Sequence, residues 1–288
     1  MTPRQALRQL IAAGGYTMAP GAYDTLTARL VEQAGFKAVY LTGGGYSRAS
    51  GYPDLGLLSL NENVHFIAQT VEAVSIPVIA DADTGYGNAI NVIRTVREYE
   101  KTGVAGFHIE DQVSPKKCGH YEGKEVVPLP EMVGKIKAAV DTRRDPDLVI
   151  IARSDARAVE GLDAAIDRVN ACLEAGADVG FVEAPQSVEE LRLIPGRLRG
   201  PALANVFEGG KTPMLAAPEL AAMGFRLGIY PSQTQRAAIR AAQRVLTALR
   251  EDGDTRRVEG DLATFQEREE AVGTARWRAL EERYLRPT

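Results

Sequence analysis

The feature that most constrains the fold of this chain is a pattern that repeats eight times along it. In each repeat a short apolar run ends in polar or glycine residues, and an amphipathic stretch with helical spacing follows. The strings QAGF, KTGV, EAGA and AMGF each place a glycine between an amphipathic stretch and the next run, as at a helix C-cap. The eight apolar runs are Thr17–Ala19, Ala38–Leu41, Val78–Ala80, Gly106–Ile109, Leu148–Ala152, Val179–Val182, Ala202–Ala204 and Arg226–Ile229.

Eight strand–helix units in succession predict an α/β fold, the closed parallel (β/α)8 barrel of the TIM type. Parallel strands that are covered by helices read as unbroken apolar runs, and these runs have that character. A doubly wound open sheet is the alternative, but no G-x-G-x-x-G motif follows the first run. The length of 288 residues also suits one barrel, for which about 250 residues are typical.

The two ends of the chain depart from the repeat. After Leu249 the string REDGDTRRVEGD is charged, and Leu262–Leu285 has the spacing of one or two further helices. We therefore predict a barrel over residues 1–250 and a helical arm over residues 251–288. The arm could pack on its own barrel or on a neighbouring subunit, and the spacing leaves both open. The first residues of the chain predict a short helix that caps the barrel.

Charge, hydropathy and cysteine content exclude several classes of protein. The formal net charge is −4 and no basic block occurs, which argues against nucleic-acid binding. No apolar run approaches the ~18 residues of a membrane-spanning helix, and the N-terminal segment lacks the apolar core of a signal peptide. Cys118 and Cys172 are too few for a disulfide framework and are compatible with a reducing, cytoplasmic location.

Polar residues and glycines recur where the predicted strands end. In such barrels the active site lies at the carboxyl ends of the strands, so these residues are candidates for it. The backbone N–H groups of Thr42–Gly44 can bind a carboxylate or an enolate oxygen, and Arg153 can hold a carboxylate through two hydrogen bonds. In chain order the candidates are Thr42, Gly43, Gly44, Asp81, Asp83, Glu110, Asp111, Arg153, Asp155, Glu183, Asn205, Tyr230 and Pro231.

Asp81 and Asp83 follow the third run, two residues apart. On an extended segment this spacing places both side chains on one side, where two carboxylates repel each other unless a cation lies between them. Oxygen ligands without His or Cys favour Mg²⁺, or Mn²⁺, over Zn²⁺. Glu110 at the next strand end is the expected supporting carboxylate. The alternative is that the two aspartates cap the following helix.

The segment KKCGH, Lys116–His120, lies in a long loop after the fourth run. Lysine and histidine beside Cys118 can lower the pKa of its thiol and supply protons, and Gly119 would let the loop approach a ligand closely. An incidental surface thiol is the alternative. We expect Cys172 to behave as a small buried apolar residue and His108 to be a core residue with its hydrogen bonds satisfied.

Strings between residues 19 and 250 resemble the isocitrate lyase and phosphoenolpyruvate mutase superfamily. KKCGH is the most discriminating, since it resembles the loop of the branch that cleaves carbon–carbon bonds. Together with EGGKTP it resembles 2-methylisocitrate lyases, 2,3-dimethylmalate lyases and petal death proteins. The strings are PGAYD (20–24), YLTGGG (40–45), GYPDLGLLS (51–59), DADTGYGN (81–88), HIEDQ (108–112), KKCGH (116–120), ARSDA (152–156), FVEAP (181–185) and NVFEGGKTP (205–213).

This resemblance implies a Mg²⁺-dependent barrel, a homotetramer in which the last barrel helix is exchanged between subunits, and a small carboxylate as substrate. It also implies roles for individual residues. Around the metal it places Asp54, Asp81, Asp83 and Glu110, with Asp83 as the direct ligand. The catalytic candidates are Cys118, Lys116, His120, Tyr40 and Glu183. The residues implied in substrate binding are Thr42, Gly43, Gly44, Gly119, Arg153, Asn205 and Pro231.

The implied reaction breaks the C2–C3 bond of a 2-hydroxy dicarboxylate or tricarboxylate of the 2-methylisocitrate or 2,3-dimethylmalate type. The products are a 2-oxo acid and a carboxylate that leaves as its enolate. Cys118 is the expected acid that protonates the enolate, because a thiol with a reference pKa of about 8.5 can act near neutral pH. The base is Tyr40 or a water held by Glu183.

Departures from the family pattern bear on the substrate. Thr42 adds a methyl group where relatives often have serine, and Phe207 would shrink the pocket and favour small dicarboxylates. Hydrolysis or decarboxylation of oxaloacetate is an alternative, although Pro231 stands where oxaloacetate hydrolases tend to have serine. The further alternatives are a phosphonomutase, against which KKCGH argues, and a barrel that binds carboxylates without catalysis.

Overall fold

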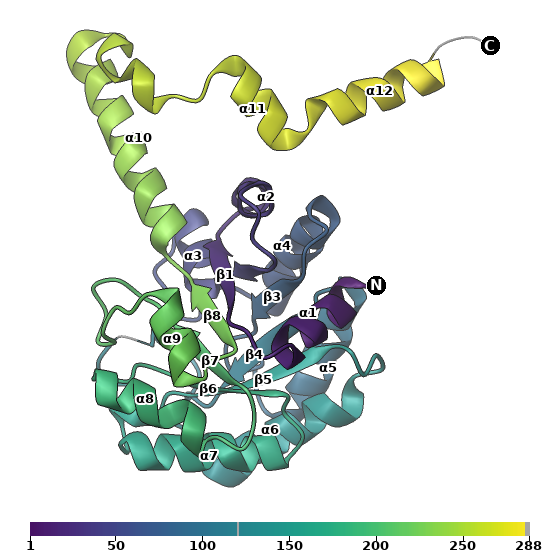
Figure 1. The fold of residues 1–288 in the computed structure, drawn as a ribbon, viewed down its shortest axis with the longest axis vertical. Helices are drawn as coiled ribbons and strands as arrows, with labels where there is room; N and C mark the ends of the chain where they lie inside the picture. Colours follow the sequence, from purple (N-terminus) through teal and green to yellow (C-terminus); the bar gives the residue numbers. More distant parts are fainter. Residues whose placement is uncertain (120, 286–288) are drawn as a thin grey trace.

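The computed structural model describes residues 1–119 and 121–285, and its centre is a closed barrel of eight parallel strands in chain order (Figure 1). Each strand pairs with the next, and β8 closes the barrel on β1, with Met18 opposite Gly228. Each predicted run overlaps the strand of the same rank, so the predicted fold class is confirmed and the open sheet is excluded. The strands are β1 (Thr17–Ala22), β2 (Val39–Leu41), β3 (Val78–Asp81), β4 (Gly106–Glu110), β5 (Val149–Ser154), β6 (Val179–Val182), β7 (Ala202–Asn205) and β8 (Leu227–Tyr230).

Helices follow the strands where the apolar spacing predicts them. The glycines predicted to end four of them, Gly35, Gly103, Gly176 and Gly224, all have φ between 84° and 107°, a region that favours glycine. Among the described residues no helix is both long and apolar enough to cross a membrane. The α-helices up to β8 are α1 (Pro3–Ala12), α2 (Thr25–Gln33), α3 (Gly43–Ala49), α4 (Leu60–Ala73), α5 (Ala89–Lys101), α6 (Leu129–Thr142), α7 (Leu162–Glu174), α8 (Val188–Arg197) and α9 (Ala217–Met223).

Two layers of apolar side chains fill the barrel domain. Inside the barrel, Ile79, Ile151 and Phe181 belong to one buried cluster. Residues of the alternate register, such as Ile150, pack outward in a second cluster against the helices. Leu7 of α1 is fully buried in the inner cluster, so the predicted N-terminal capping helix is confirmed.

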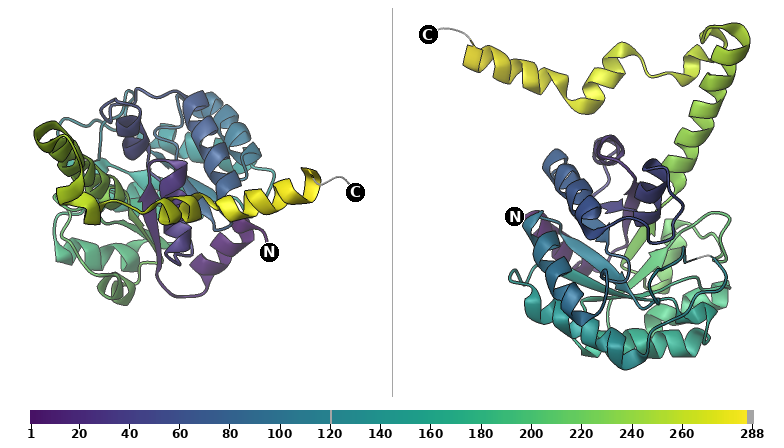
Figure 2. Two further views of the ribbon diagram at one scale, coloured as in Figure 1. Left: turned by 90° about the horizontal axis from the view of Figure 1, so that it is seen from above. Right: turned by 180° about the vertical axis from the view of Figure 1, so that it is seen from behind.

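The last part of the chain extends away from the barrel. Helix α10 (Gln233–Asp252) projects outward and leads through η2 (Arg256–Asp261) to α11 (Phe265–Val272) and α12 (Thr274–Leu285) (Figures 1 and 2). Only Gln235 and Ala248 of the 20 residues of α10 are buried. Helix α11 returns to α2, where Arg29 Nε donates a hydrogen bond of 2.9 Å to the carbonyl of Ala271. Large apolar side chains stay exposed along this part, namely Ile239, Leu246, Leu249, Leu262, Phe265, Val272, Trp277, Tyr284 and Leu285.

Candidate active site

Most of the predicted site residues surround one small cavity at the carboxyl ends of the strands. The cavity has a volume of about 60 Å³, room for only a few water molecules. It is small because Lys116, Cys118 and Gly119 lie over it on the loop between β4 and α6. The lining residues are Tyr40, Thr42, Gly44, Arg48, Asp54, Asp81, Lys116, Cys118, Gly119, Arg153, Glu183, Asn205, Phe207, Ile229, Pro231, Ser232 and Gln235.

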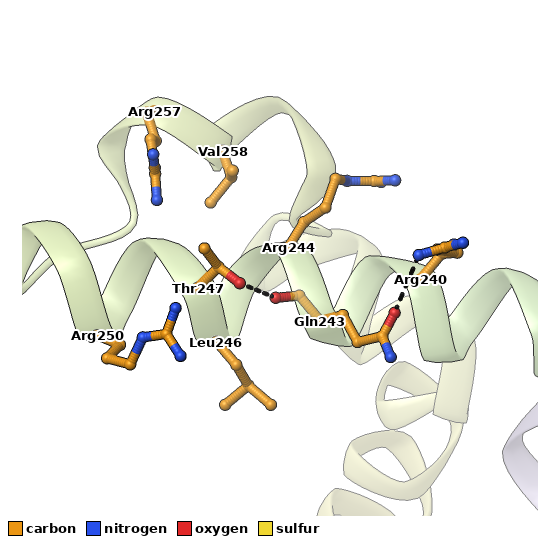
Figure 3. Close-up of a pocket in the computed structure, with 8 residues that line it drawn as sticks. All are labelled: Arg240, Gln243, Arg244, Leu246, Thr247, Arg250, Arg257 and Val258. Atoms are coloured by element: carbon orange, nitrogen blue, oxygen red, sulfur yellow. Dashed lines mark hydrogen bonds between the residues drawn. The ribbon is translucent and has the colours of Figure 1, made fainter.

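A larger hollow of about 810 Å³ lies on the arm, between α10 and η2 (Figure 3). Arginines dominate its polar lining, and neighbouring carboxylates pair with three of them, Arg244, Arg250 and Arg257. Arg244 Nε lies 2.9 Å from Asp261 Oδ2, and Arg257 Nη2 lies 2.7 Å from Glu251 Oε2. The residues that line it come from α10 and η2 alone and bring together no acid, base or nucleophile suited to catalysis. We therefore place the active site at the barrel mouth.

Lys116 joins two of the aspartates predicted to surround a metal. Its Nζ lies 2.6 Å from Asp54 Oδ1 and 2.8 Å from Asp83 Oδ1, and all three side chains are largely buried. Burial alone would lower the pKa of Lys116, but attraction by Asp83 and Asp54 outweighs it and raises the pKa well above its usual value. The ammonium group of Lys116, on the loop between β4 and α6, is thus a positive charge that lies between these two carboxylates.

Asp81 and Asp83 come together through a turn. The expectation of an extended segment was wrong, because β3 ends at Asp81 and Asp83 has a left-handed φ of 45°. The backbone N–H of Asp83 donates a hydrogen bond of 2.9 Å to Asp81 Oδ1, which fixes the turn. Burial raises the pKa of Asp83 to about 6. Repulsion by Asp81 adds to this rise, and attraction by Lys116 offsets only part of it. Asn88 caps α5, which excludes the helix-capping alternative.

Glu110 is a buried carboxylate whose oxygens lack hydrogen-bond donors among the described residues. Its Oε2 nevertheless lies 3.2 Å from Arg153 Nε. Burial raises its pKa well above the usual value, and repulsion by Asp155 adds to that shift. Such a carboxylate needs a cation, a proton or ordered water.

The donor set suits magnesium better than a metal held in a protein cage. In residues 1–119 and 121–285, no group of three or more His, Cys, Asp or Glu side chains is arranged to enclose a metal ion. Mg²⁺ needs no such cage, because it keeps several waters and binds through one or two carboxylates and the substrate. Asp81, Asp83 and Glu110 supply oxygen donors of that kind.

Arg153 is oriented by carboxylates of the protein itself. Its Nε lies 2.8 Å from Asp155 Oδ2, and its Nη2 lies 3.2 Å from Asp155 Oδ1 and 3.9 Å from Glu183 Oε2. The two-bonded contact that we expected Arg153 to offer a substrate is therefore made with Asp155, while the guanidinium still lines the cavity. Glu183 in turn accepts hydrogen bonds of 3.2 Å from Asn205 Nδ2.

Tyr40 and His108 form a buried hydrogen-bonded pair beside Asp81. Tyr40 Oη lies 2.8 Å from His108 Nε2 and 3.4 Å from Asp81 Oδ2. Burial lowers the pKa of His108 to about 4, so its imidazole is neutral at pH 7. Burial, with repulsion by Asp81, raises the pKa of Tyr40 well above its usual value, and the phenol keeps its proton. The prediction for His108 holds at Nε2 only, because Nδ1 has no hydrogen-bond partner among the described residues.

Glycine is required where the loop approaches the cavity. A Cβ on Gly119 would lie 2.5 Å from Arg153 Nη2 and 2.6 Å from Glu183 Oε1, closer than side chains tolerate. Gly43 approaches Asp81 in a similar way, since a Cβ added to Gly43 would lie 2.7 Å from Asp81 Oδ2. His120 lies outside the described residues. The other predicted residues that do not line the cavity are Gly43, Asp83, Glu110, Asp111, Asp155 and Tyr230.

Four residues that line the cavity were not predicted. Ser232 and Gln235 follow Pro231 at the end of the eighth strand, so their position was a usable signal. Gln235 Nε2 donates a hydrogen bond of 2.8 Å to the carbonyl of Gly45, which joins the start of α10 to α3. Arg48 lies on α3 and Ile229 lies within β8, and neither carried a motif that the sequence could reveal.

Known proteins similar to this chain share both its sequence and its fold. It is 48% identical over 285 residues to 2,3-dimethylmalate lyase of Eubacterium barkeri, covering 99% of each chain. It is 44% identical over 271 residues to 2-methylisocitrate lyase of Aeropyrum pernix, covering 94% of this chain and 87% of the relative.

Solved structures agree. A crystal structure of 2,3-dimethylmalate lyase, described as a PEP mutase/isocitrate lyase superfamily member, matches with a TM-score of 0.93 and 38% identity over 98% of this chain and 95% of that one. Oxaloacetate acetylhydrolase with 3,3-difluorooxalacetate matches with a TM-score of 0.93 and 35% identity over 98% and 96%. Phosphonopyruvate hydrolase with oxalate and Mg²⁺ matches with a TM-score of 0.90 and 35% identity over 99% and 100%.

A family model supplies the remaining comparison. The model of the phosphoenolpyruvate phosphomutase family matches residues 7–250, which span the whole barrel and all the predicted site residues. Together with the identities above, this match shows that the chain belongs to the PEP mutase/isocitrate lyase superfamily.

Proposed function

We propose that this protein is a carbon–carbon lyase that cleaves a 2-hydroxy dicarboxylate or tricarboxylate into a 2-oxo acid and a second carboxylate. The observation that carries the proposal is the position of Cys118, on a loop that lies over a cavity lined by Asp81, Arg153 and Glu183. A proton donor thus faces a site with carboxylates for a metal and a guanidinium for an anion. The 2,3-dimethylmalate lyase that shares 48% of its sequence supports the same reaction class.

The structure favours one of the two bases left open by the sequence. Tyr40 keeps its proton because burial and Asp81 raise its pKa, so it is better suited to donate a hydrogen bond than to accept a proton. Glu183 lines the cavity beside Asn205 and could hold a water that takes the hydroxyl proton. We assign the base to Glu183 acting through this water.

The remaining steps follow from proton balance. As the hydroxyl proton leaves, C2 becomes a carbonyl, the C2–C3 bond breaks, and its electron pair moves to C3 as an enolate. The thiol of Cys118 then gives its proton to C3, and the proton taken from the hydroxyl restores the thiol, so no co-substrate is needed. Arg153 and the backbone of Thr42–Gly44 would stabilise the anionic groups, and the loop would exclude water that could quench the enolate.

Asp81, Asp83 and Glu110, with Asp54 nearby, would hold Mg²⁺ or Mn²⁺. A metal bound there supplies Lewis-acid polarisation of the substrate oxygens. Phosphonopyruvate hydrolase, a structural relative, has been solved with oxalate and Mg²⁺, which supports this choice of ion. Lys116 pairs with two of these aspartates, Asp54 and Asp83, so we expect the loop and the metal site to respond to each other.

Within this reaction class we favour a small dicarboxylate of the 2,3-dimethylmalate type. Phe207 lines a cavity of about 60 Å³ and limits the space beside Pro231 and Ile229. Any substrate requires the loop to move, since the cavity holds only a few waters, and the additional arm of a tricarboxylate would also need space beside Phe207. The test is a Mg²⁺-dependent screen of 2,3-dimethylmalate, 2-methylisocitrate, isocitrate and oxaloacetate, with 2-oxo acids and oxalate measured separately. The proposal predicts a 2-oxo acid, with the highest kcat/KM for 2,3-dimethylmalate.

Hydrolysis of oxaloacetate is the second candidate. The oxaloacetate acetylhydrolase structure matches this chain with a TM-score of 0.93, so the scaffold supports that reaction too. Pro231 argues against it, because its side chain lines the cavity without a hydroxyl group. Oxalate from oxaloacetate, with no 2-oxo acid from any hydroxy acid in the screen, would favour this candidate over the lyase.

We further propose a cytoplasmic homotetramer in which the arm packs on neighbouring subunits, with the last barrel helix exchanged. Leu246, Phe265 and Trp277 are each more than 60% exposed, and such apolar surface usually marks an interface. A catalytic barrel over residues 1–250 with an arm over 251–288 remains our proposed division of the chain. The low cysteine content is compatible with a reducing compartment.

A further inference from the structure

Lys124 is a buried lysine of the active-site loop that lies outside the cavity. Its side chain is only 1% exposed, and its Nζ lies 2.9 Å from Asp155 Oδ1. The same ammonium donates a hydrogen bond to the carbonyl oxygen of Gly119. One positive charge therefore joins the backbone of the loop directly to a carboxylate at the end of β5.

Asp155 is a fixed anchor for this contact. Its carboxylate accepts two hydrogen bonds from the guanidinium of Arg153, and its backbone N–H donates a hydrogen bond of 2.8 Å to Asp111 Oδ1. Asp111 is itself held, since it accepts hydrogen bonds of 2.7 Å from Ser154 Oγ and 2.8 Å from Arg168 Nε. The position of Asp155 is thus set by Arg153 and Asp111 apart from Lys124, so Lys124 transmits that position to the loop.

The contact with Gly119 acts next to the reacting groups. Gly119 follows Cys118 in the chain and lies against Arg153 and Glu183, so closely that a Cβ would not fit. Other contacts hold the neighbouring residues, since the N–H of Tyr121 donates a hydrogen bond of 2.8 Å to the carbonyl of Cys118, and Gln112 bonds to the backbone of Lys117. The bond from Lys124 differs from these because it links the Gly119 carbonyl to Asp155, at the end of β5.

We propose that Lys124 is a positioning residue, which holds the Cys118–Gly119 segment closed over the active site by joining the Gly119 carbonyl to Asp155. The inference rests on the proposed function, because it concerns the loop that would protonate the enolate. It differs from a purely structural role, in which Lys124 would only balance the charge of Asp155 and leave the loop unaffected.

The test measures how readily iodoacetamide alkylates Cys118 in the full chain with Mg²⁺ present and no substrate. Peptide mass spectrometry separates Cys118 from Cys172, which is 2% exposed and serves as the internal reference. We expect Lys124→Met to speed alkylation of Cys118 roughly tenfold or more, as when a hydrogen bond from a charged group is lost. Removal of an ammonium alone would lower the thiolate fraction and slow the reaction, so faster alkylation reports an opened loop.

Glu122→Gln is the matched control. Glu122 lies on the same loop and pairs with Lys211 at 2.5 Å, but its side chain is 87% exposed, so its loss should change alkylation less than twofold. With a substrate that the enzyme turns over, Lys124→Met should lower kcat roughly tenfold or more with a smaller change in KM. Alkylation needs no turnover, so it decides the inference even if the proposed reaction is wrong.

A second variant covers the case in which Lys124→Met does not fold. Lys124→Gln replaces the ammonium, which bonds to both the Gly119 carbonyl and Asp155, with a shorter neutral amide. It should therefore also expose Cys118. Alkylation of Cys118 at the rate of the Glu122→Gln control, in whichever Lys124 variant is folded by circular dichroism, would overturn the inference.

Discussion

At the scale of single residues, burial separates the two thiols of this chain. Cys172 is 2% exposed on α7, and burial, with repulsion by Asp111, raises its pKa to about 12. Cys118 lines the cavity and forms no disulfide. The thiolate is the reactive form, so burial and its raised pKa should protect Cys172 from alkylation.

The first prediction follows from that difference. The usual pKa of a cysteine thiol here is 9.0, and its raised pKa keeps Cys172 protonated at pH values well above that. Iodoacetamide at pH 8–9 should therefore label Cys118 and leave Cys172 unmodified in the folded protein. Labelling of Cys172 should begin only as the pH approaches 12, or on unfolding. Mass spectrometry after a pH series measures both sites. Equal labelling at pH 8 would contradict the burial of Cys172.

Replacement of Cys118 tests its role as an acid. A serine hydroxyl is a far weaker acid than a thiol of similar size, so Cys118→Ser should lower kcat by about two to four orders of magnitude. Binding should survive, because Arg153 and the carboxylates are untouched. Steady-state kinetics and calorimetry with oxalate measure the two effects. Turnover close to that of the wild type would remove Cys118 from the mechanism.

Single residues also show what the sequence could reveal. Asp81, Glu183 and Asn205 could be placed at one rim because each follows an apolar run, and parallel strands of a barrel end together. The partner of Arg153 could not be inferred, since its contact with Asp155 depends on side-chain direction. The role of Lys124 depends on a contact with Asp155, 31 residues away, which no local pattern encodes.

At the scale of elements, the strands were predicted closely because each is a buried apolar run with a fixed place in the repeat. The turn after β3 was not, because Asp83 adopts a left-handed φ of 45° that the spacing of two aspartates does not reveal. Tertiary contacts stabilise that turn. Tyr99, on α5, donates a hydrogen bond of 2.9 Å from its Oη to the carbonyl of Asp81.

The loop between β4 and α6 supports a prediction at this scale. Gly119→Ala would place a Cβ 2.5 Å from Arg153 Nη2, so the loop must lift. We expect kcat to fall roughly tenfold to a hundredfold, because reacting groups would be misplaced by about 1 Å. The thermal stability of the barrel should change little, since the loop lies outside its apolar core.

Gly134→Ala is the control. Gly134 lies within α6, and a Cβ there would meet no atom within 4 Å. This change should stabilise the protein by about 0.5–1 kcal/mol, because alanine favours helix over glycine, and should leave turnover unchanged. Denaturant melts and steady-state kinetics measure both variants. Equal activity of Gly119→Ala and Gly134→Ala would show that the loop does not need to approach Arg153.

At the scale of the whole molecule, the arm is the part that one chain leaves unexplained. Helices α10, α11 and α12 expose large apolar side chains, while the barrel buries its own core. The change of pattern near residue 250 predicted an arm, but the sequence did not show that α10 already projects from the barrel. Its amphipathic spacing is the same whether the apolar face covers its own barrel or a partner.

Trp277 makes the assembly measurable. It is the only tryptophan of the chain and is 68% exposed on α12. If the arm packs on neighbouring subunits, light scattering should give about four times the 31.1 kDa of one chain, and dilution should shift the tryptophan emission to longer wavelength. Trp277→Glu should weaken the assembly. A monomer at every concentration, with unchanged emission, would contradict the proposed tetramer.

The most direct test of the proposed chemistry is the reaction of 2,3-dimethylmalate with the wild-type enzyme and Mg²⁺ in D₂O. Cleavage at C2–C3 with protonation of an enolate predicts equal amounts of pyruvate and propionate, with one deuterium at C2 of the propionate. Chelation of the metal should stop both products. No 2-oxo acid from this or any other 2-hydroxy acid, with oxalate and acetate formed from oxaloacetate instead, would contradict the lyase assignment.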